Sequence, residues 1–151
     1  MWFAEWIFWG SMVFIFYAYA GYLLALLALS CFRNRPVLVG DIQPMVSFVI
    51  TAYNEDARIK EKIENSLQQQ YPRERLDIVV ASDCSSDRTE EIVRSYAVSG
   101  VRLVRAQERR GKEAAQKLAV SQTSGEILVF SDVATTLPPY GIANIVKSFN
   151  D

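Results

Sequence analysis

Three hydrophobic segments of this chain each end abruptly in polar residues, and this repeated pattern limits the folds that the chain can adopt. The segments, with the residues that follow them, are Val46–Ala52 before Tyr53-Asn54-Glu55, Leu76–Ser82 before Asp83, and 127–131 before Asp132. Continuous apolar runs are typical of strands buried on both faces, as in parallel sheets. The carboxyl ends of parallel strands share one edge, so we expect the polar residues to meet at a ligand-binding rim.

Helical patterns lie between the strands and complete the alternation of an α/β fold with helices on both faces of the sheet. Four strands are predicted at 46–52, 76–82, 101–104 and 126–131, and four helices at 58–69, after Asp87, at 112–122 and at 138–149. In the first helix, Ile59, Ile63 and Leu67 share an apolar face, and the polar face is expected in water. Asp87 is predicted to cap the second helix, with Glu90 completing a capping box.

Residues 6–32 form an apolar and aromatic run without any charge, and the charged side chain ahead of it is Glu5. A bilayer needs roughly 20 apolar helical residues, whereas a signal-peptide core needs about 7 to 15 behind a basic start. We therefore predict a transmembrane helix in residues 1–32, in preference to a buried helix of a larger soluble protein. Arg33 and Arg35 follow the run, so the N-terminus is predicted outside and the remainder in the cytoplasm.

The composition of the chain and the motifs it lacks argue against several classes of function. The net charge of -1 gives no electrostatic case for nucleic acid as a partner, and the chain has no histidine, which excludes Ser-His-Asp catalysis and histidine-ligated zinc. No Gly-rich dinucleotide fingerprint or phosphate loop is present. Cys31 and Cys84 are expected to be reduced thiols. After a linker at 33–44 with two prolines and a glycine, residues 45–151 are predicted to form one unit.

Four segments in order resemble glycosyltransferase family 2. They read Val-Ser-Phe-Val-Ile-Thr-Ala-Tyr-Asn-Glu from residue 46, Val-Val-Ala-Ser-Asp-Cys-Ser-Ser-Asp from 79, Arg-Arg-Gly-Lys from 109 and Ile-Leu-Val-Phe-Ser-Asp from 127. The resemblance covers about residues 44–151. It implies a GT-A fold, of which this chain would hold the parallel-sheet, Rossmann-like, nucleotide-binding half behind one transmembrane helix.

The resemblance also implies an activated sugar donor, usually a UDP-sugar, and a product such as a polysaccharide, glycolipid or other cell-envelope glycan. The residues it assigns to the donor are Ala52, Tyr53, Glu55 and Asp83 at the base and ribose, Lys112 at the phosphate or nucleotide, and Asp132 at the diphosphate. Two simpler readings stay open. Asp83 could cap the turn at Ser85-Ser86, and Lys112 could belong to a solvated basic turn.

Asp132 matches the first acid of the family's Asp-x-Asp motif, which implies a divalent cation, Mg²⁺ or Mn²⁺, on the donor diphosphate. Ala134 stands where the second acid is expected, and the loss of one charged ligand should weaken such a site. Thr135 or Thr136 could offer an oxygen. The family's catalytic-base Asp and its acceptor motif are expected beyond Asp151, so no catalytic residue is assigned.

These observations predict the donor-binding half of a membrane-anchored glycosyltransferase, inactive without the remaining half or another subunit. An apolar flank beside the fourth strand is expected to be uncovered. The alternative from another class is a non-catalytic, membrane-tethered nucleotide-binding or interaction module, a decayed or split enzyme, which Ala134 favours. A nucleotidyltransferase is ranked lower, because the acidic Tyr53-Asn54-Glu55 replaces the Gly-rich basic loop such enzymes carry after their first strand.

Overall fold

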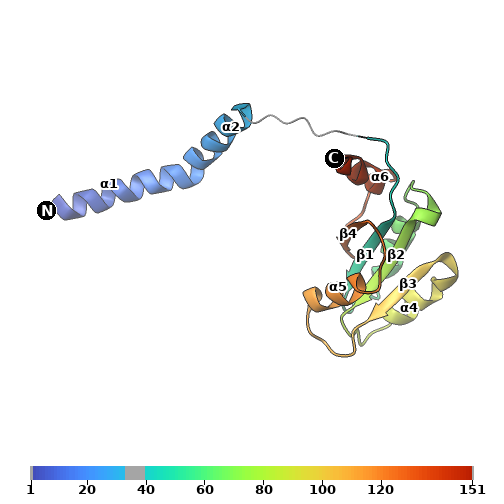
Figure 1. The fold of residues 1–151 in the computed structure, drawn as a ribbon. Coiled ribbons are helices and arrows are strands. Elements are labelled where there is room, and N and C mark those ends of the chain that lie inside the picture. Colours follow the sequence, from blue (N-terminus) through green and yellow to red (C-terminus); the bar gives the residue numbers. More distant parts are fainter. Residues whose placement is uncertain (1, 33–39, 151) are drawn as a thin grey trace. The chain divides into compact units, whose positions relative to one another are not determined.

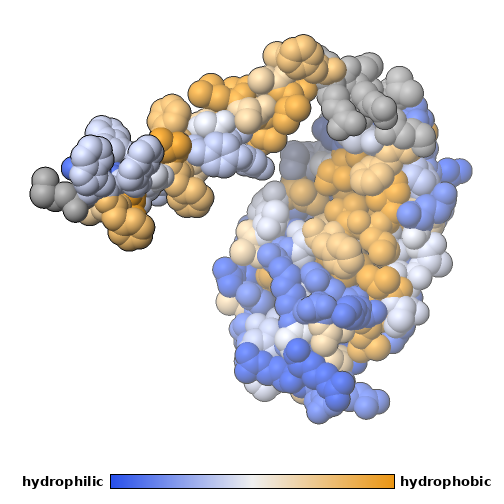
Figure 2. Space-filling model, turned by 60° about the vertical axis from the view of Figure 1, so that its left-hand side comes forward, coloured by the Kyte–Doolittle hydropathy of each residue, from blue (hydrophilic) through white to orange (hydrophobic). Residues whose placement is uncertain are grey.

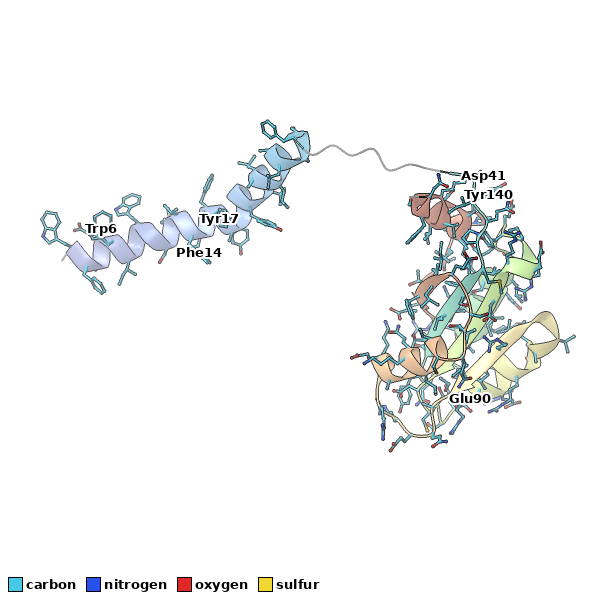
Figure 3. All side chains as sticks on the ribbon, in the orientation of Figure 1. Trp6, Phe14, Tyr17, Asp41, Glu90 and Tyr140 are labelled. Atoms are coloured by element: carbon cyan, nitrogen blue, oxygen red, sulfur yellow. The ribbon has the colours of Figure 1, made fainter. Side chains whose placement is uncertain are left out.

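The computed structural model describes residues 2–32 and 40–150, which fall into two separate units. The first unit is one long helix (Figure 1), in which α1 (Trp2–Phe16) and α2 (Tyr22–Phe32) are joined by a π-helical turn, η1 (Tyr17–Gly21). Its side chains, such as the labelled Trp6, Phe14 and Tyr17, point outward all around the axis (Figure 3). By length and composition this helix is able to cross a membrane.

The second unit is built on a four-stranded, all-parallel sheet in the order β3-β2-β1-β4 (Figure 1). The strands are β1 (Val46–Ala52), β2 (Leu76–Ser82), β3 (Val101–Arg105) and β4 (Ile127–Asp132). The central strand β1 pairs with β2 on one side and β4 on the other, so Phe48 lies beside both Ile78 and Val129. The predicted parallel sheet is therefore confirmed.

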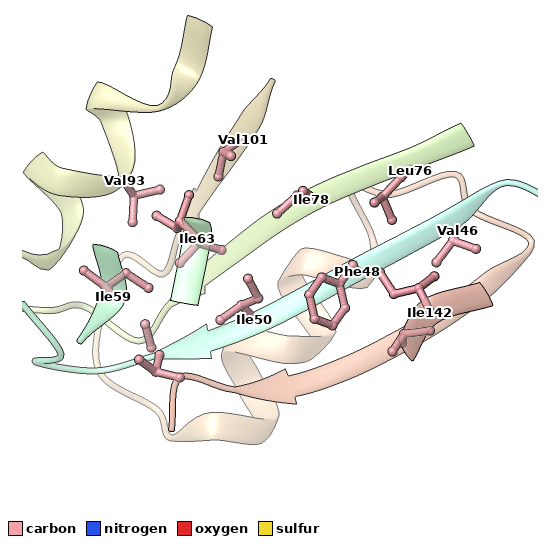
Figure 4. Close-up of a cluster of buried hydrophobic side chains, with 14 of the residues drawn as sticks. Val46, Phe48, Ile50, Ile59, Ile63, Leu76, Ile78, Val93, Val101 and Ile142 are labelled. Carbon is pink, nitrogen blue, oxygen red and sulfur yellow. The ribbon is translucent and has the colours of Figure 1, made fainter. Parts of the chain in front are cut away.

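Helices cover both faces of this sheet, as predicted. On one face α5 (Lys112–Val120) packs Ala115 and Ala119 against Val49 and Val79. The other face carries α3 (Ile59–Leu67), α4 (Thr89–Ser95) and α6 (Gly141–Val146). The larger core between these helices and the sheet is shown in Figure 4, and includes Val46, Phe48, Ile50, Ile59, Ile63, Ile78, Val93 and Ile142.

Three α-helices end earlier than the sequence patterns suggested, at Leu67, Val120 and Val146. Single turns of 3₁₀ helix lie outside the α-helices. Lys147–Phe149 continues α6, Ala97–Ser99 follows α4, and Arg73–Arg75 leads into β2. Residues 33–39 of the predicted linker lie outside the described residues. Residues 40–44 contact the sheet domain, because the Tyr71 hydroxyl donates to the Pro44 carbonyl at 2.6 Å.

The edge strand β4 leaves part of its apolar surface open to solvent. Leu128 and Phe130 are 37% and 47% exposed, and Ile145 of α6 is 38% exposed. Figure 2 shows hydrophobic residues gathered in a broad area on this unit. The expectation that a flank beside the fourth strand is uncovered agrees with these exposures.

Candidate functional site

The carboxyl ends of β1, β2 and β4 bring the polar residues of the sequence pattern to one rim. Thr51 of β1 pairs with both Ala81 and Asp132, so the three strand ends lie side by side. Both β1 and β2 then leave the sheet through a residue in the left-handed region, Asn54 with φ 51° and Cys84 with φ 59°. Such turns are uncommon without glycine and redirect the chain sharply.

Asp83 is buried at this rim and holds the following basic loop in place. Its carboxylate accepts backbone N–H groups from Arg110 at 3.0 Å and from Gly111 at 3.0 and 3.1 Å. Gly111 has φ 91°, a conformation that side chains disfavour, so glycine fits the approach of this backbone to the carboxylate. Asp83 therefore links the end of β2 to the start of α5.

Tyr53 and Arg109 form the second contact across the rim. The Arg109 guanidinium carbon lies 4.0 Å from the centroid of the Tyr53 ring, which is a cation–π arrangement. Arg109 is the first residue of the Arg-Arg-Gly-Lys segment, and it was not among the predicted site residues. The available signal was its place two residues before the Gly111 turn, on a loop fixed to Asp83.

Lys112 and Asp132 meet at the end of β4. Lys112 Nζ lies 2.5 Å from Asp132 Oδ1, and both side chains are more than half exposed. With Gln116, Ser131 and other residues they line an open pocket of about 220 Å³. An ammonium and a carboxylate that line one open pocket can be separated by an incoming anion, because a solvent-exposed pair is held by little free energy.

Ala52 and Glu55 play structural parts at the rim. Ala52 is buried, and its carbonyl accepts the Asp83 N–H at 3.0 Å. The Glu55 carboxylate binds the Arg58 guanidinium through bonds of 3.0 and 3.1 Å, while its backbone N–H donates to Thr89 at 2.8 Å. Of the six predicted donor residues, Tyr53, Asp83, Lys112 and Asp132 thus have contacts with the 109–112 loop or with one another.

Lys62 is a charged residue that was not among the predicted site residues, and the structure buries it. It lies on the inner face of α3 beside Ile59 and Ile63 and is 3% exposed. Its Nζ donates to Ser131 Oγ at 2.8 Å and to the Thr135 carbonyl at 2.5 Å. Burial lowers the pKa of Lys62 below its ordinary value, and attraction by Asp132 opposes part of that shift.

The capping prediction is right for Asp87 and wrong for Glu90. Asp87 accepts the Thr89 N–H at the start of α4 and the Asp56 N–H, each at 3.0 Å. Burial raises the pKa of Asp87, but hydrogen bonds from Thr89 and Asp56 outweigh burial and the pKa falls below its usual value. Glu90, labelled in Figure 3, turns inward and accepts from Ser82, Arg94 and Arg105, so it completes no capping box.

The rim supplies few ligands for the divalent cation implied by the resemblance. Within residues 2–32 and 40–150, no group of three or more acidic, histidine or cysteine side chains is placed to hold a metal ion. Asp132 offers one carboxylate, which already binds the Lys112 ammonium. Ala134 offers no side-chain oxygen. Among the described residues, a cation at Asp132 would therefore depend on further oxygens that are not carboxylates, such as those of a bound diphosphate.

The sequence model of the family described as Glycosyl transferase family 2 matches residues 47–151. The chain belongs to glycosyltransferase family 2. Among curated relatives, this glycosyltransferase chain is 33% identical over 91 residues to glycosyltransferase AglE of Haloferax volcanii, an overlap of 59% of the chain and 30% of AglE. It is 30% identical over 98 residues to the probable glycosyltransferase YdaM of Bacillus subtilis, or 62% of the chain and 23% of YdaM.

Solved structures agree with the GT-A assignment of the glycosyltransferase chain. Mannosyltransferase PcManGT from Pyrobaculum calidifontis, in complex with GDP-Man and Mn²⁺, matches with a TM-score of 0.75 and 34% identity, over 85% of this chain and 40% of its own. Residues 1–349 of S. aureus TarS in complex with UDP match in fold, with a TM-score of 0.63 and 22% identity over 70% of this chain and 31% of that one. The glycosyltransferase chain thus spans less than half the length of each of these proteins.

Proposed function

We propose that this chain binds the nucleotide-sugar donor of a membrane-anchored glycosyltransferase that builds a polysaccharide, glycolipid or other cell-envelope glycan. The observation that carries the proposal is the Lys112–Asp132 pair, which lies at the rim where β1 and β2 present Tyr53 and Asp83. A UDP-sugar is the first donor to test, and GDP is the second nucleotide, because similar structures were solved with UDP and with GDP-Man.

In this assignment the nucleoside lies near Tyr53 and Asp83 and the diphosphate near Lys112. An ammonium at the first residue of α5 adds to the positive end of the helix, and both favour an anion. The ammonium and the helix N-terminus attract the diphosphate more strongly as its bond to the sugar breaks, because negative charge collects on the leaving group. The acceptor hydroxyl also needs a base, and we assign that role to none of the described residues.

We propose that a divalent cation, Mg²⁺ or Mn²⁺, joins this site only together with the diphosphate. Asp132 would hold it, and the cation would neutralise charge on the leaving group. Mn²⁺ alone is then expected to leave the melting temperature of the chain unchanged. Mn²⁺ added together with UDP is expected to raise the melting temperature above its value with UDP alone. A rise with Mn²⁺ alone would indicate a metal site complete without nucleotide.

The proposal is tested by titrating UDP and GDP into the full chain in detergent micelles. We expect a dissociation constant below about 1 mM for one nucleotide, and a loss of about tenfold in Lys112→Ala, because one charge-assisted contact is removed. Lys117→Ala is the matched control, since Lys117 lies on the same helix and pairs with Glu113 at 2.8 Å. Absence of binding at millimolar nucleotide would refute the donor site. Binding without turnover by the full-length protein would favour the non-catalytic module.

We further propose that the helix Trp2–Phe32 crosses the membrane and that the sheet domain faces the cytoplasm, where nucleotide sugars are made. The test uses Val98→Cys, at a fully exposed residue, in a chain carrying Cys31→Ser and Cys84→Ser. A membrane-impermeant maleimide is expected to label this cysteine after permeabilisation only, whereas Trp2→Cys is labelled in intact cells. The reverse result would reverse the orientation.

A further inference from the structure

The buried ammonium of Lys62 ties together the two ends of the turn that carries Asp132. Ser131 Oγ, one residue before Asp132, accepts from Lys62 Nζ at 2.8 Å, and the carbonyl of Thr135, three residues after it, accepts at 2.5 Å. Both contacts come from α3, an element far away in sequence. The turn also has a backbone hydrogen bond of its own, from the Thr135 N–H to the Asp132 carbonyl at 3.2 Å. Lys62 thus adds two contacts from outside the turn, one at each of its ends.

A lysine at this position is costly for the fold. The residue is 3% exposed, and its neighbours on the same helix face are Ile59, Ile63 and Ser66. Removing an ammonium from water is unfavourable unless other groups compensate. Here Nζ lies 5.2 Å from the centroid of the Phe48 ring, in addition to its two hydrogen bonds. A methionine would fill similar space without that cost, so the charge itself calls for an explanation.

The charges around the turn explain why a charged residue stands at position 62. Lys112 binds Asp132 from the open side of the pocket, and Lys62 lies beneath the turn. Ala134 adds no negative charge where the family motif has its second acid. Arg58 and Glu61 also line the space beside residues 133–136, and they add one charge of each sign. The two lysines therefore still leave the turn net positive and suited to an anion.

We propose that Lys62 is a positioning residue for the donor diphosphate, which fixes the turn over residues 131–135 and keeps a buried positive charge behind Asp132. The inference rests on the proposed donor site. It adds that part of the attraction for the diphosphate is built into the core of the protein, and acts without a metal ion.

The test compares UDP with uridine, in the presence of EDTA, on the full chain in detergent micelles; GDP and guanosine replace them if GDP is the better ligand. Lys62→Met is expected to weaken UDP binding by about tenfold or more, because the turn loses its charged hydrogen bonds to Ser131 and Thr135 together with the positive charge behind Asp132. Uridine binding is expected to change by less than about twofold. Lys60→Met is the matched control. It removes the same charge from the same helix at an exposed position, 3.9 Å from Glu64, and should leave both affinities unchanged.

A second variant tests the inference if Lys62→Met does not fold. Ser131→Ala keeps the Lys62 charge and removes one of its two acceptors, so it should weaken UDP binding in the same direction by a smaller factor. Unchanged UDP affinity in both variants overturns the inference alone, as does an equal loss of UDP and uridine affinity with a lower melting temperature. Absence of nucleotide binding by the unsubstituted chain would instead overturn the donor site and the inference with it.

Discussion

Replacing Asp83 by alanine is expected to reduce the affinity for UDP by about tenfold or more, the largest loss of binding among the rim residues. The Asp83 carboxylate accepts N–H groups from Arg110 and Gly111, and each hydrogen bond to a charged group contributes about 1.5–3 kcal/mol. Loss of the Asp83 carboxylate would release the loop that places Arg109 over Tyr53 and Lys112 beside Asp132. Isothermal titration of the full chain in detergent measures the change.

Asp87→Ala is the matched control for this substitution. Asp87 also accepts two backbone N–H groups, from Thr89 and Asp56, but it belongs to the start of α4. We expect a loss of about 1–2 kcal/mol in the free energy of unfolding and an unchanged UDP affinity of the folded protein. Equal losses of affinity in the two variants would mean that Asp83 acts through overall stability, and the division of roles would then be wrong.

Phe48→Ala is expected to cause the largest loss of stability, about 3–5 kcal/mol, because a fully buried ring is removed from the centre of the main core. For a domain of this size the melting temperature should fall by about 10–20 °C, measured by circular dichroism. Nucleotide binding should fall as well, since the Phe48 ring lies against the Lys62 ammonium.

The control for Phe48→Ala is the same substitution on the neighbouring strand. Phe130 of β4 is 47% exposed, so its removal leaves little cavity and should cost less than about 1.5 kcal/mol. A similar fall in melting temperature for both variants would show that the β4 face is covered in solution. That result would point to association through the exposed Leu128 and Phe130.

The sheet and its rim could be predicted because each signal is local. Continuous apolar runs mark β1, β2 and β4, and the polar residue that follows each run marks the edge. Helix patterns predicted the cover on both faces for the same reason. The predicted positions of the helix ends were less accurate, since the conformation of the last helical turn depends on how the chain continues after it.

The contacts inside the site could not be predicted, because each depends on a partner distant in sequence. Lys62 resembles any polar residue of an amphipathic helix until residues 131–135 are folded over it. Glu90 fits a capping box by spacing, but Arg105 from β3 supplies a stronger partner at 2.9 Å. The stacking of Arg109 on Tyr53 likewise needs the loop that Asp83 fixes.

The strand order β3-β2-β1-β4 has a consequence for how the protein matures on the ribosome. The first three strands are consecutive in sequence and also neighbours in the sheet, whereas the chain that leaves β3 must cross β2 and β1 before β4 can pair with β1. Contacts between distant segments form late, because closing a long loop costs entropy. We therefore expect Asp132 to join the site after Tyr53 and Asp83 are in place. A nascent chain halted before residue 127 would lack β4, the edge strand that carries Asp132.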